Sequence, residues 1–176
     1  MAGRSKSSRH RTPLGTIIRG ALAGAVGTAA MDLVQYAQYR AGGGEDELVH
    51  YEFGAVKDWD SAPAPAQVGK RVVEGLFRSE LSDGVANRVN NVVHWAYGTG
   101  WGAVYGVLAG SAARPRSGWG PLFGTVQWLS DYVVLPPTGL YQPITEYGAK
   151  TLSKDWASRL VYGTTVAVVW RVLVRG

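Results

Sequence analysis

Long stretches without charged residues dominate the hydrophobic and polar pattern of this chain. No residue between Arg88 and Arg114 carries a formal charge, and Asp131 is the one charge between Arg116 and Glu146. A helix over the first stretch reaches about 37 Å, which exceeds the ~30 Å hydrocarbon core of a bilayer. The pattern therefore predicts membrane-spanning helices.

Two further stretches complete a set of four. Between Arg19 and Arg40 the one charge is Asp32, and the segment between Arg159 and Arg171 is uncharged. Long arginine side chains can extend their head groups toward water, which lengthens the last stretch. We expect an all-α polytopic membrane protein, a single domain built as a four-transmembrane-helix bundle. The helices are expected near residues 15–37, 89–111, 119–139 and 158–174; the second run is strong by itself and the fourth is weak.

Two other interpretations of the pattern stay open. Buried helices of a soluble domain would show similar stretches, but the chain contains 24 Gly, and each Gly in a soluble helix costs about 1 kcal/mol relative to Ala. In a membrane, small residues instead let helix backbones approach closely. A cleaved signal peptide over residues 4–30 is the second alternative, and Arg19 inside its hydrophobic part argues against it.

Charged residues are distributed unequally among the predicted connections. The loops 38–88 and 140–157 contain all the acidic residues except Asp32 and Asp131. Because basic residues are retained on the cytoplasmic side, both termini are predicted to be cytoplasmic and the two acidic loops to lie outside. The basic residues of the cytoplasmic side are Arg4, Lys6, Arg9, Arg11, Arg114, Arg116, Arg171 and Arg175.

The outer loop 38–88 contains an amphipathic segment. Ala41–Gly44 is a flexible break, and the Pro-rich stretch 61–65 is a stiff connector. Apolar residues then recur at helical spacing, which predicts a helix near residues 66–81 on the membrane surface or over the bundle. Its apolar positions are Val68, Val72, Val73, Leu76, Phe77 and Leu81.

Small residues recur at every fourth position in the first two predicted helices. Positions four apart share a helix face, and a Gly stripe lets two helix backbones pack closely in a membrane. We expect this seam to form within the chain, while a seam between two copies in a homo-oligomer stays open. The seam positions are Gly20 and Gly24 in the first helix and Gly98, Gly102, Gly106 and Gly110 in the second.

An internal repeat relates the two halves of the chain. The pattern [His/Arg]-x-x-Tyr-Gly-Thr occurs at residues 94–99 and again at residues 159–164, each time at the start of a predicted helix. Both helices enter from the outer side. This predicts two helical hairpins, first with second and third with fourth, related as parallel repeats.

Four ionisable groups, one in each predicted helix, fall at a similar depth in the outer leaflet. A charge within a bilayer costs a few kcal/mol on insertion scales, so each group is expected to have a partner. Asp131 with Arg159 and Asp32 with His94 are the natural pairs, with the crossed pairs as the alternative, and Gln127 lies one turn deeper than Asp131. Such a layer is either a structural clamp or a proton- or cation-binding element.

No motif in the sequence predicts catalysis. The chain has no Cys, which excludes disulfides, Cys-ligated zinc and thiol chemistry. We find no Ser/His/Asp order, P-loop or dinucleotide fingerprint. We therefore expect neither an enzyme nor a bound cofactor or metal, and no nucleic-acid partner. A structural, envelope or scaffold role in the lipid bilayer is expected, with a small proton- or ion-linked transporter or channel-like module as the alternative.

The helix patterns resemble a known family. The Gly-rich segment 20–32 with its terminal Asp32, and the segment 94–106 with its His-x-x-Tyr-Gly opening, resemble the bacterial inner-membrane proteins of the YagU/DUF1440 type. Those are small multi-pass proteins without an established biochemical activity. The resemblance therefore implies a bacterial inner-membrane location and no catalytic residues.

Overall fold

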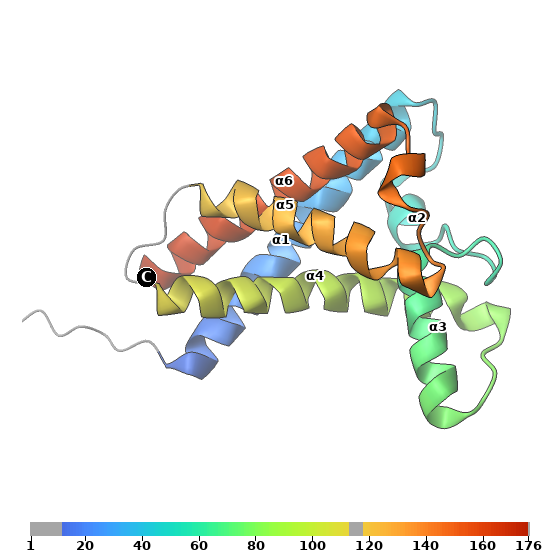
Figure 1. The fold of residues 1–176 in the computed structure, drawn as a ribbon, viewed down its shortest axis with the longest axis horizontal. Coiled ribbons are helices and arrows are strands. Elements are labelled where there is room, and N and C mark those ends of the chain that lie inside the picture. Colours follow the sequence, from blue (N-terminus) through green and yellow to red (C-terminus); the bar gives the residue numbers. More distant parts are fainter. Residues whose placement is uncertain (1–11, 113–117, 176) are drawn as a thin grey trace, which may run out of the picture.

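The computed structural model describes residues 12–112 and 118–175, and within these ranges the chain is all-α, without strands, as predicted. Four long helices form the body and shorter helices lie at one end of it (Figure 1). The long helices are α1 (Pro13–Ala41), α4 (Ala86–Ser111), α5 (Trp119–Val134) and α6 (Ala149–Arg175). The short ones are α2 (Leu48–Phe53), α3 (Ala64–Phe77) and the 3₁₀ turns η1 (Asp83–Val85), η2 (Pro136–Thr138) and η3 (Ile144–Glu146).

Two helix boundaries differ from the predicted ones. α5 ends at Val134, before the predicted 139, because Pro136 and Pro137 lack the backbone N–H that would continue the helix. α6 begins at Ala149 rather than near 158, because its first turns are polar but still good helix formers. A prediction based on uncharged segments finds the apolar part of a helix, but it does not find a polar extension such as the first turns of α6.

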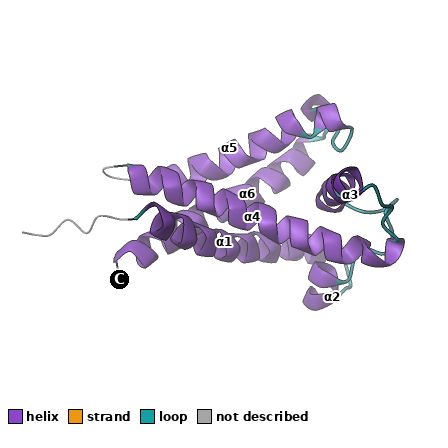
Figure 2. Cartoon of the chain, turned by 90° about the horizontal axis from the view of Figure 1, so that it is seen from below, coloured by secondary structure: helices purple, strands orange, loops and turns teal. Residues whose placement is uncertain are grey.

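The four long helices alternate in direction. The start of α1, the end of α4, the start of α5 and the end of α6 lie together at one end of the body, and α2 and α3 lie at the other (Figures 1 and 2). The start of α1 is capped by Thr12, whose hydroxyl accepts a hydrogen bond from the Gly15 N–H at 3.2 Å, and Pro13 occupies the first turn. Four consecutive membrane spans would also have to alternate in direction, so this arrangement is compatible with the predicted bundle.

Two of the described helices, α1 and α6, are long and apolar enough to cross a membrane. α5 contains 16 residues, which corresponds to about 24 Å. α4 is long, but its Asn, His, Tyr, Trp and Gly residues reduce its mean hydropathy. α6, expected to be the weak span, is thus apolar enough to cross a membrane, and α4, expected to be the strong one, is not. The prediction counted uncharged residues, and an uncharged segment can still have a low hydropathy.

α1 and α4 pack through the predicted Gly residues, within one chain. A Cβ added at Gly24 would lie 2.6 Å from the Gly98 carbonyl oxygen and 2.8 Å from Gly102 Cα, and one at Gly20 would lie 2.8 Å from Gly106 Cα. Backbone therefore meets backbone along this seam. At its end, a Cβ on Gly110 would lie 2.6 Å from the Thr16 methyl group.

A second seam of the same kind joins α5 to α6, and sequence analysis did not identify it. A Cβ added at Gly120 would lie 2.8 Å from the Gly163 carbonyl oxygen, and one at Gly163 would lie 2.6 Å from Gly124 N. Gly98 and Gly163 occupy the same place in the two repeated motifs. The contacts do not follow this alignment. Gly163 meets Gly120 and Gly124 as Gly102 meets Gly20 and Gly24, whereas a Cβ on Gly98 would meet the Thr28 side chain. The two hairpins share one kind of seam, but it lies one helical turn out of register with the repeated motif.

The hairpins meet through α1 and α6 and through aromatic side chains at the centre. A Cβ on Gly27 of α1 would lie 2.7 Å from a Val166 methyl group on α6, and the Tyr162 hydroxyl donates to the Gly98 carbonyl at 2.5 Å. Tyr105 of α4 contacts Phe123 of α5, with 5.1 Å between ring centroids. Long side chains therefore fill the space between these two helices.

Aliphatic residues face away from the body. None of the Leu and Ile side chains in the described ranges is buried, although these residues are among the most frequently buried in soluble proteins. The interior is built mainly of Gly, Ala, aromatic and polar residues, together with Met31 and Val166. Exposed aliphatic residues include Leu14, Ile17, Ile18, Leu22, Val26 and Leu33 on α1, Val104, Val107 and Leu108 on α4, Leu122, Val126, Leu129 and Val133 on α5, and Val168 and Val172 on α6.

The amphipathic helix α3 docks on α4 through small residues. A Cβ on Gly69 would lie 2.8 Å from a Val93 methyl group, and Ala66 packs in a small cluster with Trp59 and Ala86. Three of the predicted apolar positions do not pack on the bundle, because the second half of α3 extends past it (Figure 1). Val72, Leu76 and Phe77 are exposed.

Candidate polar site at the loop end of the bundle

Both natural pairs of the predicted polar layer occur in the structure, and the crossed pairs do not occur among the described residues. His94 Nε2 lies 3.0 Å from Asp32 Oδ1, which joins α4 to α1. Arg159 Nη2 lies 3.0 Å from Asp131 Oδ2, which joins α6 to α5. Each pair therefore bridges one of the two Gly seams, at the end of the bundle that carries the loops.

The Arg159 pair is embedded in a network of polar partners. Tyr97 of α4 donates its hydroxyl to Asp131 Oδ1. One turn before Arg159, Asp155 lies 3.9 Å from the guanidinium and accepts hydrogen bonds from Trp128 Nε1 at 3.0 Å and from the Tyr132 hydroxyl at 3.1 Å. Both oxygens of Asp131 thus have a partner, as a stable buried ion pair requires.

Gln127 is placed in the bundle but joins neither pair. Its side chain is fully buried, and neither its amide oxygen nor its amide nitrogen has a hydrogen-bond partner among the described residues. The predicted layer therefore contains the Asp131–Arg159 ion pair and the hydrogen-bonded Asp32–His94 pair, with Gln127 separate from both.

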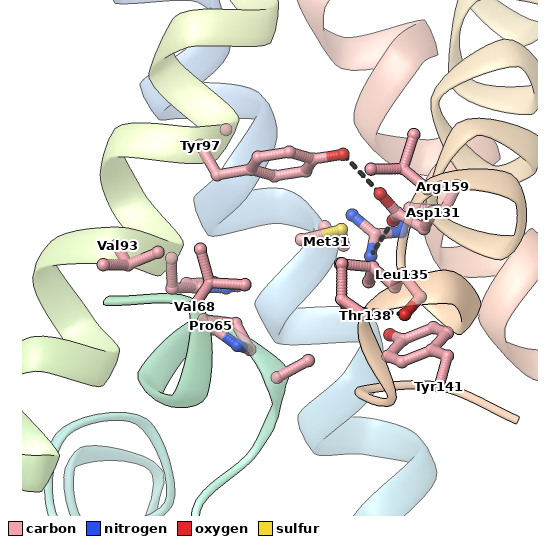
Figure 3. Close-up of a pocket in the computed structure, with 14 residues that line it drawn as sticks. Met31, Pro65, Val68, Val93, Tyr97, Asp131, Leu135, Thr138, Tyr141 and Arg159 are labelled. Atoms are coloured by element: carbon pink, nitrogen blue, oxygen red, sulfur yellow. Dashed lines mark hydrogen bonds and ion pairs between the residues drawn. The ribbon is translucent and has the colours of Figure 1, made fainter. Parts of the chain in front are cut away.

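The two pairs border one cavity of about 350 Å³. Figure 3 shows Tyr97, Asp131 and Arg159 on one side of it and Pro65 and Val68 of α3 on the other. Burial raises the pKa of the Tyr141 phenol to about 12, so this group, in the loop before α6, keeps its proton at neutral pH. The lining comprises Met31, Ala64, Pro65, Val68, Val93, His94, Tyr97, Gly98, Asp131, Val134, Leu135, Thr138, Tyr141 and Arg159.

Glu52 of α2 joins the Asp32–His94 pair, and sequence analysis assigned it to the outer loop with no role. Ligand atoms of Asp32, Glu52 and His94 all lie within 4.8 Å of one another. Burial raises the pKa of Glu52 to about 7, and the neighbouring Asp32 carboxylate acts in the same direction. These three side chains could hold a metal ion. Spacing could not identify Glu52, because six acidic residues precede α3 in that loop.

Three tyrosines and one asparagine position α2 against the long helices. Tyr51 of α2 packs on Tyr36 and Tyr39 of α1, with ring centroids 5.4 and 4.8 Å apart. Asn87 of α4 donates its side-chain amide to the Phe53 carbonyl. Glu52 lies between these anchored neighbours, and its side chain is therefore directed at the junction of α1 and α4.

The chain was compared with protein-family models, curated proteins and solved structures, and nothing matched it in any of the three.

Proposed function

We propose that this chain is an integral membrane protein whose four long helices span the bilayer. The exposed Leu, Ile and Val side chains on all four long helices carry this proposal, since none of the described Leu and Ile side chains is buried. In water such a surface would exceed the apolar patches that monomeric proteins expose. In a bilayer it would be the lipid-facing surface, while Gly seams and paired polar groups occupy the interior.

The orientation proposed has both termini in the cytoplasm. It is supported by the alternating helix directions and by the sequence before α1, between α4 and α5 and at the end of α6, which contains Lys and Arg residues but no acidic residue. The resemblance to YagU/DUF1440 proteins leads us to propose the bacterial inner membrane. α5 is shorter than the hydrocarbon core, so we expect the bilayer to be locally thinner around it. Trp119 and the η2 turn would then lie at the two membrane interfaces.

A non-enzymatic structural or scaffold role in the envelope fits the Asp131–Arg159 network best. Every oxygen of Asp131 has a partner, and the network joins α4, α5 and α6. A carboxylate that must bind and release a proton or ion needs a free oxygen, and both oxygens of Asp131 are occupied by partners in the part of the chain that the structure describes. We therefore propose that it clamps the two hairpins in register.

Single-cysteine labelling tests the proposed topology, because the parent chain has no Cys. Ser61 is exposed in the loop before α3, and Ser117 lies in the connection between α4 and α5, outside the described residues. In intact cells, a membrane-impermeant maleimide should label Ser61→Cys and spare Ser117→Cys, and both should react after lysis. Equal labelling of both variants in intact cells, or recovery of the protein in the soluble fraction, would contradict the proposal.

A small ion-linked transporter or channel-like module is the second candidate function. The observation that favours it is the oxygen Asp32 Oδ2, which is buried without a hydrogen-bond partner among the described residues, beside His94 of the cavity lining. In proteoliposomes, Asp32→Asn and His94→Gln should then abolish proton or cation flux while the yield of folded protein stays normal. A lower folded yield of both variants, with no flux from the parent protein, would instead support a purely structural pair.

A further inference from the structure

The junction of α1, α2 and α4 brings together three side chains that commonly bind metal ions. Asp32 comes from α1, Glu52 from α2 and His94 from α4, and one ligand atom of each lies within 4.8 Å of the other two. They are far apart in sequence, so the fold itself assembles the cluster. Neither carboxylate has a Lys or Arg partner among the described residues.

Asp32 adds an independent sign that a ligand belongs here. Its side chain is 7% exposed, and Oδ1 lies 3.0 Å from His94 Nε2. The other oxygen, Oδ2, is buried and has no hydrogen-bond partner. A buried carboxylate oxygen without a partner is rare and costly, because the desolvated charge is not compensated.

The charge of the cluster points to a cation rather than to water alone. Two carboxylates and one imidazole face one another in a partly buried site, and the carboxylates repel when both are ionised. A divalent ion would neutralise both and occupy the free position of Asp32.

We propose that Asp32, Glu52 and His94 bind a divalent first-row transition-metal ion of the Zn²⁺ type. The imidazole favours Zn²⁺ and its neighbours in the series over Mg²⁺ and Ca²⁺, which prefer oxygen ligands throughout. Three protein ligands leave a position for water, as in open zinc sites. The inference goes beyond the proposed structural role and depends on neither the topology nor transport, since α1, α2 and α4 form the site within one chain.

Calorimetry on the purified full-length chain in detergent tests the site. The protein is stripped with EDTA, exchanged into buffer and titrated with ZnCl₂, and separately with MgCl₂ and CaCl₂. We expect one saturable Zn²⁺ site, with much weaker binding of the other two ions. Glu52→Gln and His94→Gln should each weaken Zn²⁺ binding about tenfold or more.

The chain offers a matched control for each variant. Glu47→Gln makes the same charge change at the start of α2, where Glu47 is exposed and its side chain makes no capping hydrogen bond. His50→Gln removes the exposed histidine that lies 3.8 Å from Asp46. Both controls should bind Zn²⁺ like the parent protein. Zn²⁺ should also raise the thermal midpoint of the parent and of both controls, but not that of Glu52→Gln.

Three results would overturn the proposal: no saturable Zn²⁺ binding by the parent protein, unchanged binding by Glu52→Gln, or equal loss in the two controls. Glu52 is half-buried on a short helix that Tyr51 and Asn87 anchor, so its variant is expected to fold, which circular dichroism checks. Cysteine labelling at 61 and 117 is independent of the metal. A failed metal site and a failed topology are therefore distinguishable.

Discussion

Gly102→Ala is expected to lower the free energy of unfolding by about 3 kcal/mol, whereas Gly100→Ala, two residues away on the same helix, is expected to leave it nearly unchanged. A Cβ at Gly102 would lie 2.5 Å from the Gly20 carbonyl oxygen and 2.6 Å from Gly24 N. Both are backbone atoms of a packed helix, which cannot move aside as a flexible side chain would. A Cβ at Gly100 has nothing within 4 Å.

The two glycine variants are compared by unfolding in mixed micelles of increasing SDS content, followed by tryptophan fluorescence and circular dichroism. Because both substitutions introduce the same methyl group into the same helix, intrinsic helix propensity cancels. Equal stability of the two variants would show that α1 and α4 do not pack through this seam.

Arg159→Gln is expected to destabilise the protein by about 3 kcal/mol or more, because it leaves the buried Asp131 carboxylate and the half-buried Asp155 carboxylate without their cation. Arg159 Nη2 lies 3.0 Å from Asp131, and the guanidinium also faces Asp155. Arg171→Gln provides the control, since Arg171 lies on the same helix and forms no ion pair in the described ranges. Its effect is expected to stay within about 0.5 kcal/mol.

A double substitution separates the ion pair from the loss of arginine packing. If the pair acts as a clamp, Asp131→Asn combined with Arg159→Gln should recover part of the stability that Arg159→Gln loses, because the unpaired charge at residue 131 is removed. Strictly additive losses in the same unfolding experiment would argue against direct coupling of the two side chains.

The Gly seam between α1 and α4 and the two ion pairs could be predicted from sequence for a common reason. A spacing of four places residues on one helix face, so the Gly stripe at 98–110 and its partner at 20–24 were visible without a structure. Depth along each helix then placed Asp32 near His94 and Asp131 near Arg159. Depth alone left the crossed pairs open, since it carries no information on which helices are neighbours.

The contribution of Glu52 could not be predicted in the same way. It is presented by a six-residue helix that three tyrosines hold against α1, and no periodicity relates such a segment to the long helices. The docking of α3 was also missed in part. Its apolar face was visible, but α3 packs on α4 through Ala66 and Gly69, because small residues permit the closer approach.

The helices that pack against α1 follow it in the chain, so α1 is made before its packing partners. It packs against α4 on one face and against α6 on another. When synthesis has reached residue 112, the seam with α4 can close, but the face around Gly27 still lacks Val166 and Tyr162. α6, which is 27 residues long, therefore completes the packing of α1, and nascent chains that lack α6 expose the face of α1 around Gly27 to other helices.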